Sequence, residues 1–468
     1  MKKDMTSGSP FRLILLFSIP LLIGNVFQQL YSMADTIIVG NTISAKALGA
    51  VGCTGGISFL VIGFVQGITS GFSVVTAQRF GAGDEDGVRR SVGTSILLCV
   101  GVTVVVTAIS VLACRPLLEL MSTPADIIDD AYSYIVVIFA GIGATVLFNL
   151  FSSILRALGD SLTPLVFLVI ACIINVGLDF ALILWGGMGV AGAGWATVIA
   201  QLISGVLCVI YSLIRYPILR LKRSDWKLNL RFCWEHLRIA LPMAFQFSVT
   251  AVGVIVLQSA LNGFEILEKA RLGESYAVAA FAAASKIDQL ATQPLLSFGV
   301  AMATYSAQNY GAGRIDRIKA GVKSCSILST CFAVAGGVLM NLFGKNLVYL
   351  FATDIHPDLI QKAQTYLLIT GSFYTVLGFL FIFRNVLQGI GSSTVPLIAG
   401  FIELVLRSAV AFFLAGPAGY VGICFAGPIA WWGAAIPLAI AYFVVIRRLG
   451  NYQRHPTQHS EEPAPQPS

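Results

Sequence analysis

Long apolar segments recur from one end of this chain to the other, and they restrict its fold more than any other feature. The first, residues 13–39, contains one charged residue, Asp35. A helix that crosses the hydrocarbon core of a bilayer needs about 20 mostly apolar residues. Only 11% of the residues are charged, against roughly 25% in soluble domains. The chain is therefore predicted to be an all-α polytopic membrane protein.

We predict twelve transmembrane helices joined by short connections. Their approximate ranges are 13–39, 48–78, 91–114, 131–156, 163–184, 190–214, 236–261, 277–308, 321–343, 361–389, 394–415 and 421–446. The first segment is too long for a cleaved signal peptide and has no small-residue cleavage site, so we expect it to remain as the first helix.

Basic residues are distributed unequally between the two sides of the predicted membrane domain. Most of the 30 Lys and Arg residues fall on loops and helix ends that face the same side as the N-terminus. Cytoplasmic loops carry such an excess, so both termini are predicted to be cytoplasmic, in the cell (inner) membrane. The formal net charge of +7 then reflects topology, and no nucleic-acid partner is expected.

The two halves of the chain share short motifs in the same order. Ala77–Gly83 returns as Ala307–Gly313, and Leu158–Pro164 returns as Ile390–Pro396, at nearly equal offsets along the chain. Each half holds six predicted helices, so both halves enter the membrane from the same side. This pattern predicts two parallel six-helix repeats around a central cleft, as in transporters that alternate access. We expect a monomer.

Five parts are predicted along the chain. They are a cytoplasmic N-terminus (1–12), a first lobe (13–214), a basic cytoplasmic connector (215–235), a second lobe (236–446) and a disordered cytoplasmic tail (447–468). The sequence contains no nucleotide-binding Gly-rich motif and no His or Cys spacing typical of a metal site. We therefore expect neither an enzyme nor an ATP-driven pump, and no cofactor.

Charged residues inside apolar helices are costly, at least about 2.5–3.5 kcal/mol each at the bilayer centre, so those that are present indicate function. Six of them stand out: Asp35, Asp179, Lys286, Asp288, Glu403 and Arg407. Acids outnumber bases in this set, so a cavity lined by these residues is expected to be negatively charged and to favour cationic substrates.

The two acids of the first half are predicted to form one site. Asn175 and Asp179 are four residues apart and share a helix face. The alternating helix directions place five polar residues at a similar depth: Asp35, Asp179, Asn175, Tyr134 and Thr197. Their oxygens suit H⁺ or Na⁺, and the absence of His and Cys at this depth argues against a soft metal. If Na⁺ is the ion, its expected ligands are Asp35, Asn175, Asp179 and Thr197.

An alternative is that these five polar groups serve only to hydrogen-bond one helix to another. This alternative stays open in particular for the phenol of Tyr134 and the hydroxyl of Thr197. The repeat favours a function for the acids, because Asn175 corresponds to Arg407 and Asp179 to Ala411 in the second half. Groups that serve helix packing alone would more readily be retained in both halves.

The charged residues of the second half have less definite roles. Glu403 and Arg407 are four residues apart, a spacing that suits a structural ion pair. Lys286 and Asp288 face different ways, and all four residues are candidates to line a cavity. In the first half, Pro20 lies inside the first predicted helix, where a proline removes a backbone hydrogen bond and permits a bend.

Several motifs together resemble the MATE family of multidrug and toxic compound extrusion transporters, and most of all its prokaryotic DinF-like and MepA-like branch. They are Met33–Gly40, Ala77–Gly83, Arg156–Asp160 and Asn175–Asp179. The resemblance implies two six-helix bundles with a V-shaped cleft. It also implies efflux of small organic cations by antiport with H⁺ or Na⁺.

The resemblance further implies which residues bind the coupling ion, namely Asp35, Asp179, Asn175, Tyr134 and Thr197, and that Pro20 bends its helix on protonation. The NorM-like branch uses second-lobe acids in helices seven and ten. No acid lies within 241–261 or 363–383, so that site is expected to be absent. The alternatives are a lipid-linked oligosaccharide flippase, which needs a strongly cationic cavity, and a non-transporting receptor or scaffold.

Overall fold

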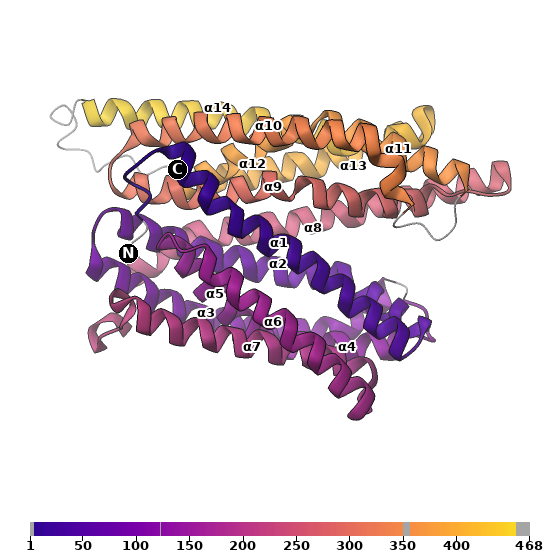
Figure 1. Ribbon diagram of the computed structural model, residues 1–468, viewed down its shortest axis with the longest axis horizontal. Coiled ribbons are helices and arrows are strands. Elements are labelled where there is room, and N and C mark those ends of the chain that lie inside the picture. The colour runs from indigo at the N-terminus through magenta and orange to yellow at the C-terminus, as the bar shows by residue number, and fades with distance from the viewer. Residues whose placement is uncertain (1–3, 122, 350–355, 455–468) are drawn as a thin grey trace. The chain divides into compact units, whose positions relative to one another are not determined.

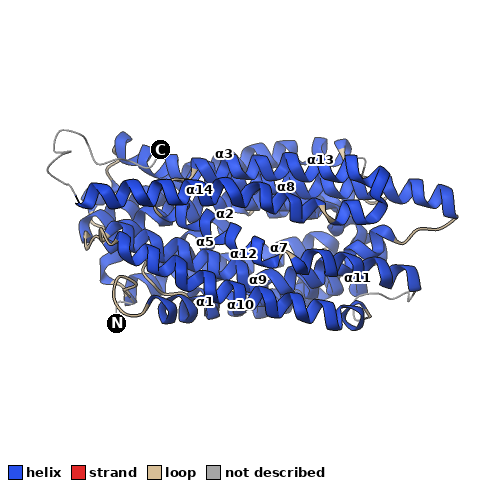
Figure 2. Cartoon of the chain, turned by 90° about the horizontal axis from the view of Figure 1, so that it is seen from above, coloured by secondary structure: helices blue, strands red, loops and turns tan. Residues whose placement is uncertain are grey.

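The computed structural model describes residues 4–121, 123–349 and 356–454, and within these ranges it contains helices and no strands (Figure 2). In the first half, the six predicted segments become α1 (Pro10–Thr42), α2 (Ala45–Gly81), α3 (Glu85–Leu120), the bent pair α4 (Ile128–Ala140) and α5 (Ile142–Ala157), α6 (Leu162–Phe180) with a π-helical extension (Ala181–Trp185), and α7 (Gly189–Arg215). Two 3₁₀ helices, Pro217–Leu219 and Arg223–Trp226, follow in the connector.

The second half repeats this order of helices. It comprises α8 (Leu230–Leu272), α9 (Ala277–Gly311), α10 (Ile315–Val348), the bent pair α11 (Pro357–Ser372) and α12 (Tyr374–Gly389), α13 (Thr394–Cys424) and α14 (Ala426–Arg454). Helix α14 continues to Arg454, so the tail that we expected to be disordered from residue 447 begins as helix. Residues 455–468 of that tail, like residues 1–3, lie outside the described ranges.

The long helices correspond to the twelve predicted segments, although one of them falls short in apolar character. In the described part of the chain, nine single helices are long and apolar enough to cross a membrane, and two bent pairs raise this to eleven. The remaining predicted segment, 277–308, is the 35-residue helix α9, whose Lys, Asp and Gln side chains lower its mean hydropathy. Each predicted segment thus corresponds to one helix or one bent pair, which confirms the all-α polytopic fold.

The internal repeat is visible in the backbone. Helices α4 and α5 meet at 48° across Gly141, and α11 and α12 meet at 50° across Phe373. The turns after these pairs also correspond, because Gly159 and Gly391 both have positive φ, at 85° and 92°. A residue with a Cβ rarely adopts this conformation. The two breaks, and likewise the two glycines, are separated by the same offset as the motif Leu158–Pro164 and its repeat.

Packing divides the chain into two compact units, and the division falls inside the two long helices α1 and α8. The first unit consists mainly of Ile19–Ser248, and the second mainly of Val249–Tyr310 and the residues from Arg314 onward. The segment Gly8–Ser18 belongs to the second unit, where Arg317 donates a hydrogen bond to the Gly8 carbonyl at 3.0 Å. The lobe limits 13–214 and 236–446 follow the repeat instead, and they remain a prediction.

The first part of α8 is held tightly in the first unit. Arg79 of α2 donates to the carboxylate of Glu235 at 2.9 Å. Gly71 lies so close to α8 that a Cβ added to it would be 2.3 Å from the Ala240 Cα. Close approach of helices through small residues is how membrane helices gain packing energy, since lipid already surrounds apolar side chains.

A continuous apolar core in the first unit supports the helices that carry the predicted site. Phe72 of α2 and Ile135, Phe139 and Ile154 of the α4–α5 pair are fully buried in this cluster. Helix α7 packs against α4, α5 and α6 (Figure 1). Helices α4, α6 and α7 are therefore fixed beside one another, and they provide four of the five predicted site residues.

Candidate functional site

A cavity of about 290 Å³ lies within the first unit, among α1, α2, α4, α5, α6 and α7. Two polar stripes line it, formed by Asn25, Gln28, Ser32 and Asp35 of α1 and by Thr145, Asn149, Ser152 and Arg156 of α5. Members of each stripe are three or four residues apart, so they share one helix face. The volume is near the lower limit of roughly 300 Å³ typical of pockets for small molecules.

Asp35 lines this cavity, and Asp179 lies beside Asp35. Asp35 is 7% exposed and Asp179 is fully buried, and their carboxyl groups are within interaction range of each other. No basic side chain contributes to the environment of either acid. Asp35 Oδ1 and both carboxyl oxygens of Asp179 have no hydrogen-bond donor among the described residues.

This arrangement leaves the two acids without a compensating charge among the described residues. A carboxylate oxygen only accepts hydrogen bonds, so two facing carboxylates can bond to each other only when one of them carries a proton. Two like charges that share a site also repel. A proton or a small cation between Asp35 and Asp179 removes both penalties, and the surrounding protein provides no substitute for it.

Thr197 and Asn175 complete the polar group around the acids. The Asn175 amide donates to Thr197 Oγ1 at 3.3 Å, while Asn175 Oδ1 has no donor in the described part of the chain. Tyr134 lines the same cavity and lies in the electrostatic environment of both acids. The structure therefore brings all five residues predicted for this site into one place.

Tyr31 also belongs to the polar residues around the two acids, although it was not among the site residues predicted from the sequence. Its hydroxyl and that of Thr197 are 3.1 Å apart and hydrogen-bonded, and Asp35 acts on it electrostatically. A signal was present, because Tyr31 precedes Asp35 by four residues and so shares its helix face. The site thus contains two phenols rather than one.

The donor set is consistent with H⁺ and also with Na⁺. The expected Na⁺ ligands Asp35, Asn175, Asp179 and Thr197 are adjacent, and three of them present oxygens without donors. No group of three or more His, Cys, Asp or Glu side chains in the described ranges has metal-binding geometry. A bound Na⁺ would therefore depend on the amide and hydroxyl oxygens as well as on the carboxylates.

Pro20 lies within α1 and lines the same cavity as Asp35. Because proline has no N–H, the helix lacks one backbone hydrogen bond at this turn. The packing of α1 changes from one compact unit to the other between Ser18 and Ile19, directly before Pro20. The predicted position of the proline inside the helix is confirmed, and its bending remains a prediction.

Glu403 of the second unit forms a buried ion triad with two arginines. Arg384 Nη2 lies 2.8 Å from Glu403 Oε2, and Arg407 Nη2 bonds to the other carboxylate oxygen. The predicted Glu403–Arg407 pair is thus present. Arg384 lies near the end of α12, yet it is only 7% exposed. Its burial was not predictable from its own helix, because the partner lies on the following helix, α13.

The charged residues Lys286, Asp288, Glu403 and Arg407 do not line the cavity of the first unit. Asp288 accepts a hydrogen bond from the hydroxyl of Tyr374 at 2.7 Å, and Lys286 is exposed. The charges that do line the cavity are Asp35 and Arg156. The first-unit cavity thus carries one acid and one base, and the expected excess of acids in a cavity lined by the six intramembrane charges remains a prediction.

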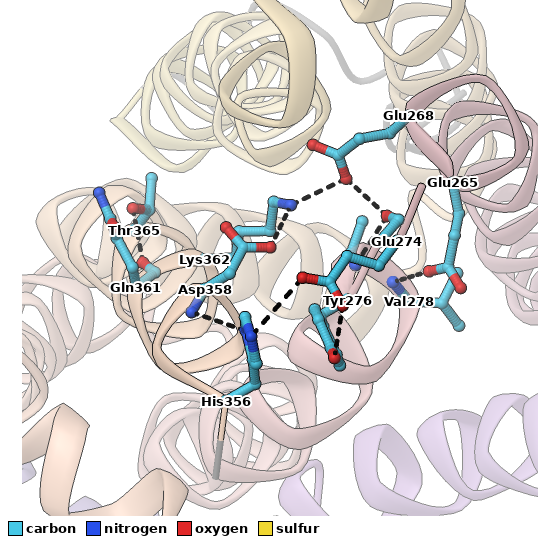
Figure 3. A network of polar contacts seen from close by, with 12 residues as sticks. Glu265, Glu268, Glu274, Tyr276, Val278, His356, Asp358, Gln361, Lys362 and Thr365 are labelled. Carbon is cyan, nitrogen blue, oxygen red and sulfur yellow. Dashed lines mark hydrogen bonds and ion pairs between the residues drawn. The ribbon is translucent and has the colours of Figure 1, made fainter. Parts of the chain in front are cut away.

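A second polar network joins α8, α9 and α11 at one end of the second unit (Figure 3). Lys362 lies 2.8 Å from Glu268 and 2.6 Å from Asp358. The ring of His356 stacks on Tyr276 with centroids 4.3 Å apart. These contacts connect the end of α8 and the start of α9, which are neighbours in sequence, to the start of α11, which is far from them in sequence, and this indicates a structural role.

Comparison with known proteins agrees with the geometry. The MatE family profile matches this chain twice, at residues 20–181 and 252–413. The two matches are separated by the same offset as Leu158–Pro164 and its repeat, and together they cover more than half of the chain. The duplication inferred from the motifs is thereby confirmed.

Curated relatives match nearly the whole chain. The "Probable multidrug resistance protein YpnP" of Bacillus subtilis is 28% identical over 413 residues, covering 86% of this chain and 88% of that protein. The "FAD transporter" of Shewanella oneidensis is 25% identical, with coverage of 84% and 86%. The "Multidrug export protein MepA" of Staphylococcus saprophyticus is 21% identical, with coverage of 89% and 90%.

Solved structures support the fold. A "multidrug resistance MATE family transporter of the MOP superfamily" in an outward-facing conformation superposes with a TM-score of 0.87 at 23% identity, covering 96% of this chain and 99% of that one. A structure described as MATE in complex with MaL6 gives a TM-score of 0.87 at 23% identity, with coverage of 96% and 98%. Similarity at this identity shows the architecture alone.

Proposed function

The chain belongs to the MATE family of multi-pass membrane transporters, and we propose that it exports small organic compounds by antiport with H⁺ or Na⁺ at the Asp35–Asp179 site. One observation carries the proposal. Among the described residues, the buried acids Asp35 and Asp179 have no base nearby and have carboxyl oxygens without a donor, and Asp35 lines a polar cavity of the same compact unit. The multidrug names of the relatives support small compounds as the exported class.

The coupling follows from charge compensation. Without a bound cation, Asp35 and Asp179 repel each other and attract a positive group into the cavity. Binding of H⁺ or Na⁺ removes this attraction, so a cationic substrate in the cavity loses its electrostatic partner. A ligand shifts a conformational equilibrium only by its differential affinity for the two states, and here the affinity for substrate and the affinity for the ion oppose each other.

Helix α1 is suited to transmit this change. It carries Asp35 and Pro20 on the cavity side, and both follow the segment Gly8–Ser18 that packs in the other unit. A proline within a helix is a common site of bending. We propose that α1 changes its curvature at Pro20 when the charge at Asp35 is neutralised.

The remaining features of the proposal concern location and composition. Both termini are proposed to be cytoplasmic in the cell membrane, in line with the bias of basic residues. The transporter is proposed to act as a monomer without cofactor, enzymatic activity or nucleic-acid partner. A flippase for lipid-linked oligosaccharide is not favoured, because the cavity carries a single arginine beside an acid rather than a cluster of bases.

A flux measurement tests the proposal. Purified protein in liposomes is loaded with a fluorescent organic cation, and export is followed under an imposed pH gradient or an imposed Na⁺ gradient. We expect Asp35→Asn and Asp179→Asn each to reduce gradient-dependent export at least about tenfold, because the neutral amide cannot exchange a cation. The exposed acid Asp130 provides the control, and Asp130→Asn should stay within about twofold of the wild type.

The result also identifies the ion. Export that responds to the pH gradient alone assigns H⁺, and export that responds to the Na⁺ gradient alone assigns Na⁺. Gradient-dependent export at the wild-type rate by Asp179→Asn would refute coupling at this site.

A further inference from the structure

Arg156 ends the polar stripe of α5 and faces the cavity with no acidic partner. The residue is half-buried in the last turn of the helix and lines the cavity. Its hydrogen bond is to a neutral group, Ser153 Oγ, at 2.7 Å. In the described part of the chain, no carboxylate lies within salt-bridge distance of it. A desolvated guanidinium in this position is costly unless an anion compensates it.

The acid nearest in sequence does not compensate Arg156. Asp160 accepts hydrogen bonds from the Leu162 and Thr163 backbone N–H groups at 3.2 and 3.1 Å. Its other oxygen accepts from the Thr163 hydroxyl at 2.7 Å and from the Tyr216 hydroxyl at 2.8 Å. These four bonds occupy the carboxylate and explain why it is not available to Arg156.

Further polar groups surround Arg156 at the same end of the cavity. Ser152 and Ser161 also line it. Ser152 is 2% exposed, lies beside the Cys208 thiol, and its hydroxyl has no hydrogen-bond partner of normal geometry among the described residues. A guanidinium, an unpartnered buried hydroxyl and a second hydroxyl are donors, which is the chemistry that recognises a carboxylate or a phosphate.

This end of the cavity is distant from the acid pair. Along α5, Arg156 follows Thr145 by eleven residues, or about 16 Å at 1.5 Å per residue. Along α1, Gly24 precedes Asp35 by eleven residues and packs near Leu165 and Leu168 in the first half of α6. Arg156 and Asp35 therefore stand at opposite ends of one polar cavity.

We propose that Arg156 and Ser152 form an anion subsite, and that the favoured substrates are amphoteric. Such a compound carries a cationic group for the Asp35 end and a carboxylate or phosphate, on the order of 10–15 Å away, for the Arg156 end. The planar guanidinium binds such groups with two parallel hydrogen bonds. This assignment adds a substrate class to the proposed export function. It rests on that function, because only export identifies the bound ligand as a substrate.

Equilibrium binding of two matched dyes tests the subsite. Acridine orange alkylated at its ring nitrogen with a nine-carbon chain that ends in a carboxylate carries a cationic ring and an anion that can reach the proposed separation, and its methyl ester is the same cation without the anion. Fluorescence anisotropy with the detergent-solubilised full chain gives an affinity for each. We expect the wild type to bind the acid more tightly than the ester. Arg156→Gln should weaken binding of the acid about tenfold, or about 1.4 kcal/mol, and binding of the ester less than about twofold.

Two further variants separate charge from structure. Arg156→Lys keeps the charge but cannot form two parallel hydrogen bonds, so we expect an intermediate loss of affinity for the dye that carries the carboxylate. Arg215 is an exposed arginine of α7 that does not line the cavity, and Arg215→Gln should change neither affinity. Elution of Arg156→Gln as a monodisperse peak on size exclusion, with unchanged ester affinity, shows that the variant is folded.

Several results would overturn the subsite. These are equal losses for both dyes, no loss for either, or a wild type that does not prefer the acid. Displacement of the acid dye by a low mole fraction of phosphatidylglycerol would assign Arg156 to a lipid headgroup instead. Failure of the export proposal is a distinct outcome, in which neither dye moves under a gradient although the wild type still prefers the acid.

Discussion

The two sequence repeats place their buried charges on corresponding helices but compensate them differently. When the repeats are aligned by their shared motifs, Ser152, Ala171 and Asn175 of the first become Arg384, Glu403 and Arg407 of the second. The second repeat therefore contains an acid between two bases, and the three side chains bond to one another. Asp179 of the first repeat becomes Ala411, so the acid that faces Asp35 has no counterpart.

The difference indicates where an external ion is needed. The triad of the second repeat satisfies its own carboxylate, so a bound cation would gain little there. Among the described residues, carboxyl oxygens of Asp35 and Asp179 in the first repeat have no donor, which is the reason for proposing that a cation compensates them. We therefore infer that the same helix scaffold carries one internally neutralised ionic cluster and one whose acids are compensated by a bound ion.

Substitution of Glu403 should have the largest effect on stability. Glu403→Gln removes the charge that compensates two buried guanidinium groups, and loss of one partner of a buried ionic cluster costs about 3–5 kcal/mol. The free energy of unfolding, measured by denaturant titration in mixed micelles, should fall by that amount. Glu119→Gln at the exposed Arg115–Glu119 pair, where the carboxylate is 61% exposed, should change it by less than about 0.5 kcal/mol. Equal effects at the two positions would contradict the contrast.

Asp288 is a second acid of the second repeat whose carboxylate is stabilised by a group of the protein itself. The hydroxyl of Tyr374, itself 1% exposed, donates to it at 2.7 Å. Tyr374→Phe removes this donor, and a hydrogen bond to a charged group contributes about 1.5–3 kcal/mol. Unfolding in mixed micelles should show a loss in that range, while Tyr349→Phe at a residue that is 49% exposed should show almost none. A silent Tyr374→Phe would mean that Asp288 is compensated by another group.

The sequence predicted the architecture because the signals for it are local. The length of an apolar segment sets the number of helices, and a repeated motif such as Ala77–Gly83 sets the relation of the halves. The gathering of Asp35, Asn175 and Asp179 was also predictable, since helix direction and position along each helix give depth. These inferences need no knowledge of which helix packs against which.

The features that the sequence did not predict depend on contacts between helices. Arg384 and Arg156 both lie near helix ends, where counts of basic residues treat them as exposed to water. The structure buries Arg384 against Glu403 and turns Arg156 to the cavity. Tyr31 was missed for a different reason, because a single phenol in an apolar helix gives no signal until its neighbour Asp35 is recognised.

Tyr216, which directly follows the last helix of the first repeat, is expected to make a smaller contribution to stability, and this contribution should depend on pH. Burial, and then the hydrogen bond to Asp160, raise the pKa of Tyr216 above its ordinary value of 10.0. The folded state therefore keeps the phenol proton at pH values where the unfolded state loses it, and the stabilisation is present below about pH 10 and declines above it. Tyr216→Phe should cost about 1 kcal/mol at neutral pH.

Unfolding of Tyr216→Phe and wild type should be compared from pH 7 upward. The difference between them is expected to stay constant to about pH 9 and to shrink above about pH 10. In the second repeat Ser392 replaces Asp160, so no equivalent dependence is expected there. A difference that grows with pH would contradict donation by the phenol.

Asp179→Asn should have the smallest effect on stability, although we expect it to reduce gradient-dependent export strongly. The carboxyl of Asp179 is fully buried without a donor or a base, so its replacement by a neutral amide of the same shape removes a poorly compensated group rather than a favourable contact. The free energy of unfolding should change by less than about 1 kcal/mol, or increase. Glu403 is also buried. A small change in stability for Asp179→Asn, together with a large loss for Glu403→Gln, would therefore show that the effect depends on charge compensation and not on burial alone. A loss of about 3 kcal/mol in Asp179→Asn, as expected for a paired buried charge, would show that the first repeat neutralises its acids internally and would remove the basis for an ion site there.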